Sequence, residues 1–144
     1  MKLKYSNLLK YVEKIFVGYK LSKKHAAISA KYLVDADFSG VNTHGLARVS
    51  MYCMRLKKKL IKAKPKIKIK KISSNVFHLD ADNSIGMVAA DMATDLLIQN
   101  TKKNGIVLVG VKNSGHYGMS GLFAEKAAKA GLMVWCYTNA PPFI

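Results

Sequence analysis

The chain has 144 residues, half of them hydrophobic, which is enough for one domain with a buried core and argues against disorder. No window holds the ~18 uncharged apolar residues of a spanning helix, so we expect neither a membrane span nor a signal peptide. The two cysteines, Cys53 and Cys136, form no CxxC motif and no zinc-like spacing with histidine. We therefore expect no metal site, reduced thiols that pack in the core, and a cytoplasmic location.

The net charge of +16 comes entirely from the first half of the chain. Residues 1–71 contain 19 Lys and Arg against three acidic residues, whereas residues 72–144 contain five of each. The densest stretch, residues 55–71, has ten basic residues and could bind a phosphate backbone. However, its lysines alternate with Ile67 and Ile69 as in a half-buried strand, and no aromatic residue stands among them to stack on bases. We favour a solvated lysine-rich surface over a nucleic-acid site.

Three helices are predicted in the first part of the chain. The first covers residues 6–18, and the second covers 22–40; each begins at a serine that can cap it and ends near a glycine. A third helix is predicted from about residue 44 to residue 60, before the break at Pro65. We expect residues 1–72 to form an N-terminal helical region.

The second part of the chain has the pattern of an α/β protein. The predicted elements are a hairpin of strands 67–72 and 76–79, a helix over 86–103, a strand over 106–111, a helix over 119–130 and a strand over 132–137. The last strand, helix and strand indicate a right-handed crossover, so these two apolar strands are predicted to be parallel and covered on both faces. We expect residues 73–144 to form the start of an α/β domain.

Two parallel strands do not make a stable sheet covered on both faces, and the chain stops just after the second. We therefore expect this sequence to be the N-terminal fragment of a longer protein. An intact stop codon after Ile144, with no continuation in any reading frame, would count against that expectation.

A glycine-flanked histidine, His116, follows the strand predicted at 106–111, within the segment NSGHYG at 113–118. Ligands of open α/β sheets bind at the carboxyl ends of parallel strands, and a histidine there can transfer protons near neutral pH. A loop histidine that only bonds a backbone carbonyl is an equally good interpretation. The glycines of this loop do not have the GxGxxG spacing of the common dinucleotide-binding motif.

His44, Arg48 and Tyr52 are spaced four residues apart, so a helix would place all three on one stripe. An imidazole, a guanidinium and a phenol on one stripe could bind a carboxylate, with Arg48 making a bidentate contact. Alternatively, Arg48 pairs with Asp35 or Asp37, and Tyr52 packs in the core.

These segments belong to a set of motifs that spans nearly the whole chain. In chain order they are ADFSGVNTHG at 36–45 followed by Arg48 and Tyr52, DADNSIG at 80–86, GIV at 105–107, NSGHYG at 113–118 and TNAPP at 138–142. In order and spacing the set resembles the malate/L-lactate dehydrogenase family of NAD(P)-dependent oxidoreductases, which includes ureidoglycolate and sulfolactate dehydrogenases.

The resemblance implies a homodimeric oxidoreductase that transfers a hydride between NAD or NADP and C2 of a 2-hydroxy or 2-oxo acid such as malate or lactate. It implies a family-specific α/β fold that differs from the usual dinucleotide-binding one. It also implies that His116 is the catalytic proton acceptor or donor, and that His44 and Arg48 line the substrate site, to which we also assign Tyr52. Ala140 falls at a cofactor-contacting position.

Family members are more than twice as long as this chain, and most of the cofactor site lies in the part absent here. We therefore expect this chain alone not to bind NAD(P) productively. Two other classes stay open: a nucleic-acid-binding module that uses Lys57–Lys71 and binds in a salt-sensitive way, and an inactive remnant of the dehydrogenase.

Overall fold

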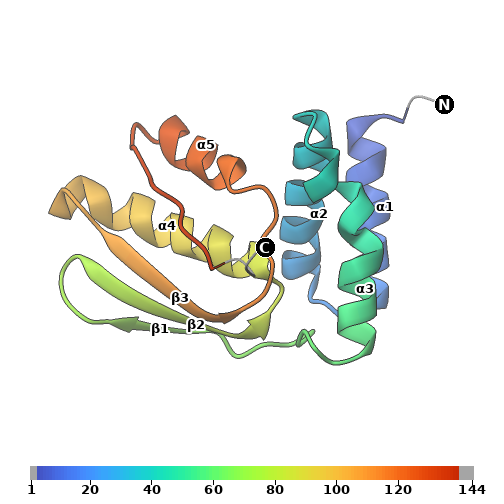
Figure 1. Ribbon diagram of the computed structural model, residues 1–144, viewed down its shortest axis with the longest axis horizontal. Helices are drawn as coiled ribbons and strands as arrows, with labels where there is room; N and C mark the ends of the chain where they lie inside the picture. Colours follow the sequence, from blue (N-terminus) through green and yellow to red (C-terminus); the bar gives the residue numbers. More distant parts are fainter. Residues whose placement is uncertain (1–2, 140–144) are drawn as a thin grey trace, which may run out of the picture.

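The computed structural model describes residues 3–139 and shows an α/β fold, as predicted. In chain order the elements are α1 (Tyr5–Gly18), α2 (Lys23–Phe38), the 3₁₀ helices η1 (Asn42–His44) and η2 (Leu46–Arg48), α3 (Val49–Lys57), β1 (Lys68–Lys71), β2 (Val76–Ser84), α4 (Gly86–Asn104), β3 (Leu108–Ser114) and α5 (Gly121–Lys129). Figure 1 shows α1, α2 and α3 side by side at one end of the molecule. At the other end, α4 packs on the sheet and α5 packs on α4.

The first two helices lie close to their predicted positions, because their signals are local. The serine cap predicted for the first helix is wrong: α1 begins at Tyr5 after Lys4, with no side-chain capping hydrogen bond. The hydroxyl of Ser22 caps α2 by accepting a hydrogen bond from the backbone N–H of His25 at 3.2 Å. Apolar residues recur on one face of α1, and two of them, Val12 and Phe16, are buried against the rest of the core.

The third helix is shorter than predicted. In place of its first turns, residues 42–48 form η1 and η2, and the α-helix begins only at Val49. The physical reason is Asp37 at the end of α2, whose carboxylate accepts hydrogen bonds from the Asn42 side chain at 2.6 Å and from the backbone N–H of Leu46. These hydrogen bonds hold residues 42–48 against the end of α2, so the regular α-helix begins only after them.

The sheet has three strands in the order β1-β2-β3, and the predicted hairpin of β1 and β2 is confirmed. The predicted partner of β3 is wrong: β3 pairs in parallel with β2, through the crossover helix α4. Residues 132–139, where a further strand was predicted, contain no strand. β2 is longer than predicted and reaches Ser84. Its pairing is irregular near Asp82 and Asn83, whose φ angles are 48° and 56°. The edge of β2 that does not pair with β1 pairs with β3.

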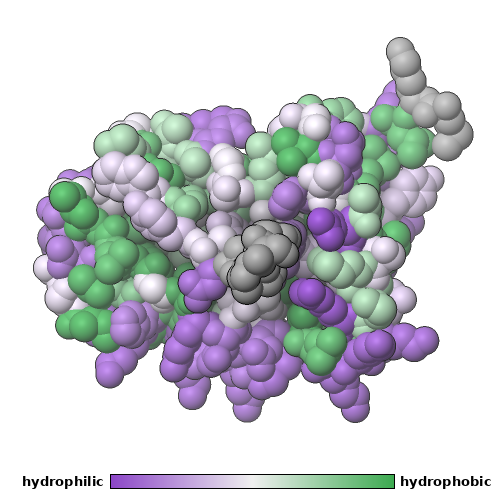
Figure 2. Space-filling model, in the orientation of Figure 1, coloured by the Kyte–Doolittle hydropathy of each residue, from purple (hydrophilic) through white to green (hydrophobic). Residues whose placement is uncertain are grey.

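The sheet is more exposed than predicted, because the helix that mainly covers it is α4. All four residues of β1 are exposed, so the strand is present but its predicted half-burial is wrong; Ile67, just before β1, is partly buried and packs on the core. β3 is also largely exposed instead of covered on both faces, and Leu108 is 64% exposed. Figure 2 shows hydrophobic residues gathered at the end of the sheet where β3 begins. Of the two cysteines predicted for the core, Cys53 is buried but Cys136 is exposed.

The nine lysines of residues 57–71 are all exposed. Figure 2 shows a hydrophilic band along the edge of the molecule formed by β1 and the segment before it. Lys62 pairs with Asp82 at 2.5 Å, while β1 presents its lysines on the outer edge of the sheet. Charged side chains at such an edge disfavour pairing with strands of other molecules.

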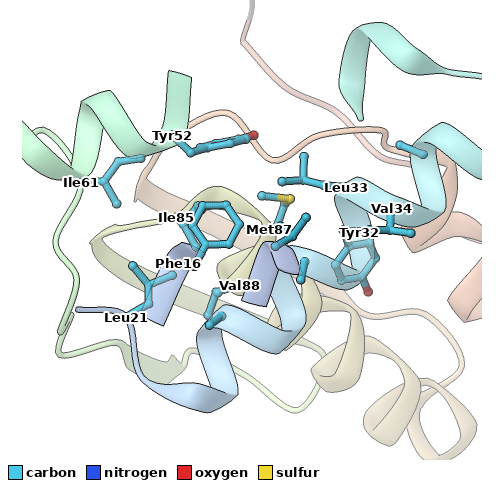
Figure 3. Close-up of a cluster of buried hydrophobic side chains, with 14 of the residues drawn as sticks. Phe16, Leu21, Tyr32, Leu33, Val34, Tyr52, Ile61, Ile85, Met87 and Val88 are labelled. Atoms are coloured by element: carbon cyan, nitrogen blue, oxygen red, sulfur yellow. The ribbon is translucent and has the colours of Figure 1, made fainter. Parts of the chain in front are cut away.

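The main core joins the helices of both halves of the chain. One buried cluster contains a residue from each of α1, α2, α3, α4 and α5, in turn Phe16, Leu33, Tyr52, Met87 and Phe123. Figure 3 labels the first four of these. This shared core fixes α3 relative to the loop that joins β3 to α5, and these two segments carry Tyr52 and His116, while His44 and Arg48 lie in η1 and η2 just before α3.

Candidate active site

The His44 segment is held in place by Asp37. Gly45 lies so close to this carboxylate that a Cβ there would overlap its atoms, so the approach requires glycine. Within the segment, the Thr43 hydroxyl lies 3.0 Å from Nδ1 of His44 and leaves Nε2 of that ring for other partners.

Arg48 lies at the end of η2 and is half-buried, and one hydrogen bond on one edge of its guanidinium holds the side chain in place. Its Nε donates a hydrogen bond to the carbonyl oxygen of Thr43 at 2.6 Å. The alternative pairing with Asp35 or Asp37 is not found among residues 3–139, because those carboxylates bond to other groups. The terminal Nη atoms of Arg48 therefore keep the fork that binds carboxylates in a bidentate way.

The His116 loop is placed by the end of the sheet and by α4. At the end of β3, Asn113 adopts a φ of 51° and its side chain donates to Asp80 of β2 at 3.0 Å. Beyond it, the backbone of Gly115 and His116 packs directly against Gly86, the first residue of α4.

The two predicted histidines meet. The rings of His44 and His116 are stacked, with centroids 5.5 Å apart and an interplanar angle of 23°. At the edge of the His116 ring, the hydroxyl of Tyr52 lies 2.6 Å from Nδ1. Segments far apart in the sequence thus place two imidazoles, a phenol and, next to His44, a guanidinium in one small region.

The surroundings of His116 favour its neutral form. Burial lowers the pKa of His116 below its usual value of 6.5, and the positive charges of His44, Arg48 and Arg55 lower it further. A histidine that is neutral near pH 7 can accept a proton, and its cationic neighbours attract an anion.

The predicted geometry of the site is partly wrong. His44, Arg48 and Tyr52 do not share one helical stripe, because His44 and Arg48 lie in η1 and η2 while Tyr52 lies in α3. The Tyr52 side chain is fully buried in the core, as in the alternative interpretation, yet its hydroxyl contacts His116. Ala140 lies outside the described residues.

Two residues of the site, Asp37 and Arg55, were not predicted as such. Asp37 organises the His44 segment; its signals are that it lies within the motif at 36–45 and that it is an acidic residue in a strongly basic region. Arg55 lines a hollow of about 200 Å³ that also reaches Gly115. Arg55 lies three residues after Tyr52, a spacing that places both on the same side of a helix and could have indicated a role in the site. In the sequence, however, it looks like part of the run of lysines that follows.

We expect Gly86→Ala to destabilise the fold and displace the His116 loop. Its Cβ would overlap the carbonyl oxygens of Gly115 and His116, which are backbone atoms, so the free energy of unfolding should fall by about 1–3 kcal/mol. Urea unfolding measures this loss. Gly18→Ala in α1 is the matched control, since no atom lies within 4 Å of its Cβ, and it should leave stability equal or slightly higher. Equal stabilities of the two variants would contradict the close packing at Gly86.

Comparison with known proteins decides the family. The sequence profile described as malate/L-lactate dehydrogenase matches residues 3–144. The chain belongs to the malate/L-lactate dehydrogenase family. Ureidoglycolate dehydrogenase (NAD(+)) of Escherichia coli O157:H7 is 32% identical to it over 144 residues, which are 100% of this chain and 41% of that protein. L-sulfolactate dehydrogenase of Methanocaldococcus jannaschii is 32% identical over 142 residues, or 99% of this chain and 41% of that protein.

Solved structures of malate/L-lactate dehydrogenase relatives share the fold. Malate dehydrogenase from Pyrococcus horikoshii OT3 superposes with a TM-score of 0.87 at 28% identity, covering 91% of this chain and 38% of that one. Sulfolactate dehydrogenase from Methanocaldococcus jannaschii superposes with a TM-score of 0.86 at 33% identity, and the match covers 90% of this chain and 38% of that one. The chain therefore spans about two fifths of the length of the relatives that it matches. The predicted family and fold class are confirmed.

The described part of the chain has neither a membrane-spanning helix nor a cluster of metal-ligating side chains. No helix of residues 3–139 is long and apolar enough to cross a bilayer. The same residues contain no group of three or more histidine, cysteine or acidic side chains arranged to hold a metal ion.

Proposed function

We propose that His44, Arg48 and His116 form the substrate-binding and proton-transferring part of an NAD(P)-dependent 2-hydroxy acid dehydrogenase. The observation that carries the proposal is the convergence of the two histidines, stacked 5.5 Å apart, beside an arginine whose terminal nitrogens are free to bind a carboxylate. Membership of the malate/L-lactate dehydrogenase family supports the reaction class.

The chemistry of these groups fits oxidation of a secondary alcohol next to a carboxylate. Arg48 binds the carboxylate through its Nη atoms and so fixes the orientation of the neighbouring carbon. His116, held neutral by its surroundings, accepts the hydroxyl proton, and in the reverse direction its imidazolium returns that proton to the carbonyl oxygen. His44, stacked on His116, lies on the substrate side of the ring.

When bound, the nicotinamide supplies the hydride acceptor or donor for this reaction. The half-buried imidazole of His116, beside the Arg48 guanidinium, is a suitable place for the nicotinamide ring. The reason is that the proton and the hydride leave adjacent atoms of the substrate, so the proton acceptor and the hydride acceptor must lie close together. Residues 3–139 contain no GxGxxG loop for the phosphates, and we assign no phosphate contact to them. Contact of Ala140 with the cofactor, and a cytoplasmic homodimer, are proposed on the family resemblance.

The direction of the His116 pKa shift predicts the pH dependence of turnover. For oxidation of the 2-hydroxy acid, His116 must be neutral, so kcat/KM should be level above pH 6.5 and decline only below it. For reduction of the 2-oxo acid, His116 must be protonated, so kcat/KM should rise as the pH falls toward the same pKa. Steady-state rates across pH in both directions measure this; an oxidation limb with its midpoint above pH 7 would contradict the assignment.

The activity itself is tested with the protein encoded by the complete reading frame that contains this chain. Oxidation of NADH and NADPH is followed with pyruvate, oxaloacetate or a cyclic imine as the substrate to be reduced. We expect turnover with at least one of them, and none with acetone, which lacks the carboxylate that Arg48 binds. Absence of substrate-dependent oxidation with either cofactor would refute the proposal and favour an inactive remnant.

A further inference from the structure

Tyr52 is placed to control which nitrogen of His116 carries the proton. Its ring is fully buried and packs edge-on against Phe16, with centroids 6.5 Å apart (Figure 3). Its hydroxyl oxygen lies 2.6 Å from Nδ1 of His116 and 3.3 Å from the carbonyl oxygen of the same residue. Burial raises the pKa of Tyr52 well above its usual value of 10, so the phenol keeps its proton.

The single phenolic proton allows two arrangements. If Tyr52 donates to Nδ1, the neutral imidazole carries its own proton on Nε2 and has no lone pair there. If Tyr52 donates to the carbonyl oxygen, Nδ1 must carry the proton and donate it to the phenol, and Nε2 then has the free lone pair.

We propose that Tyr52 is a positioning residue that holds His116 in the second arrangement, so that Nε2 is the atom that accepts and returns the proton. The inference rests on the proposed function and assigns a role that differs from direct substrate binding.

Two physical arguments favour this arrangement. In the first arrangement the lone pairs of the Tyr52 oxygen would face the carbonyl oxygen of His116 at 3.3 Å, which is repulsive. In addition, the only nitrogen lone pair of the imidazole would be on Nδ1, where it accepts the hydrogen bond of the buried phenol and cannot reach a substrate. In the second arrangement neither contact of the hydroxyl has to break.

With His116 in the second arrangement, the proton and the electrons of the reaction are fully accounted for. The substrate hydroxyl loses its proton to Nε2, the hydride leaves C2 for the oxidised nicotinamide, and the C–O bond becomes a carbonyl. The resulting imidazolium keeps its Nδ1–H bonded to Tyr52, and in the reverse direction the same Nε2–H returns to the carbonyl oxygen. The hydrogen bond between Tyr52 and His116 is therefore unchanged between the two protonation states.

Long-range ¹H–¹⁵N correlation spectra of this chain, recorded above pH 6.5, test the proposal without any need for activity. We expect a protonated Nδ1 and an unprotonated Nε2 in the His116 ring. Tyr52→Phe should shift the ring toward the Nε2–H form, which is the commoner form of free histidine. Tyr32→Phe is the matched control: it removes another buried hydroxyl, one that donates to Asp91 at 2.6 Å, and should leave His116 unchanged.

A wild-type His116 found mainly in the Nε2–H form, or the same form in wild type and Tyr52→Phe, would overturn the proposal. If Tyr52→Phe does not fold, the wild-type spectrum still decides between the two arrangements. In the complete protein, Tyr52→Phe should lower kcat by about 10–100-fold with little change in KM. A protein with the expected wild-type spectrum but no turnover would refute the proposed function and leave the tautomer assignment standing.

Discussion

His116→Ala is expected to lower kcat for oxidation of the 2-hydroxy acid by about 10²–10⁴-fold, the usual contribution of a positioned general base. KM should change little, because in the proposed site the carboxylate of the substrate is bound by Arg48 and not by the imidazole. The measurement is steady-state turnover of the complete protein with its preferred acid.

Two further variants make the His116 result specific. His78→Ala removes an exposed histidine of β2 and should leave turnover unchanged. His44→Ala removes the ring stacked on His116 and should raise KM more than it lowers kcat. If His116→Ala keeps normal turnover while His44→Ala abolishes it, the proton is carried by His44 and the two assignments must be exchanged.

Arg48→Ala is expected to lower kcat/KM for the acid by about 100-fold or more, mainly through KM, because a charge-assisted, bidentate contact is lost. Arg48→Lys should recover only part of this loss. A lysine ammonium can attract the carboxylate, but it cannot make the fork-like contact while also bonding to the carbonyl oxygen of Thr43.

Exposed lysines provide the control for charge alone. Lys64→Ala removes one positive charge from the surface and should leave kcat/KM within experimental error. If Arg48→Ala and Lys64→Ala have equal effects, Arg48 contributes only to the general positive potential and does not bind the carboxylate.

The sequence was most informative where the signals are local or repeated. The cap at Ser22, the apolar face of α1 and the turn between β1 and β2 depend on neighbouring residues, and these elements are confirmed. The family could be predicted because its motifs are ordered along the chain, and the match over residues 3–144 confirms it.

The errors arise where residues far apart in the sequence interact. The carboxylate of Asp37 organises residues 42–48 and delays α3, an effect that helical periodicity does not contain. The partner of β3 depends on the free edge of β2 and on α4 as the crossover, and an apolar run carries no information about which strand it will pair with. The contact between Tyr52 and His116 likewise depends on the tertiary fold.

We propose that the complete protein moves a hydride from C2 of a 2-hydroxy acid while His116 takes the hydroxyl proton. The most direct test uses the complete protein, lactate or malate deuterated at C2, and mass spectrometry of the reduced nicotinamide. We expect the deuterium to appear in the nicotinamide, none to be lost to solvent, and the transfer to be almost abolished in His116→Ala. Deuterium released to solvent, or undiminished transfer in His116→Ala, would contradict this proposal.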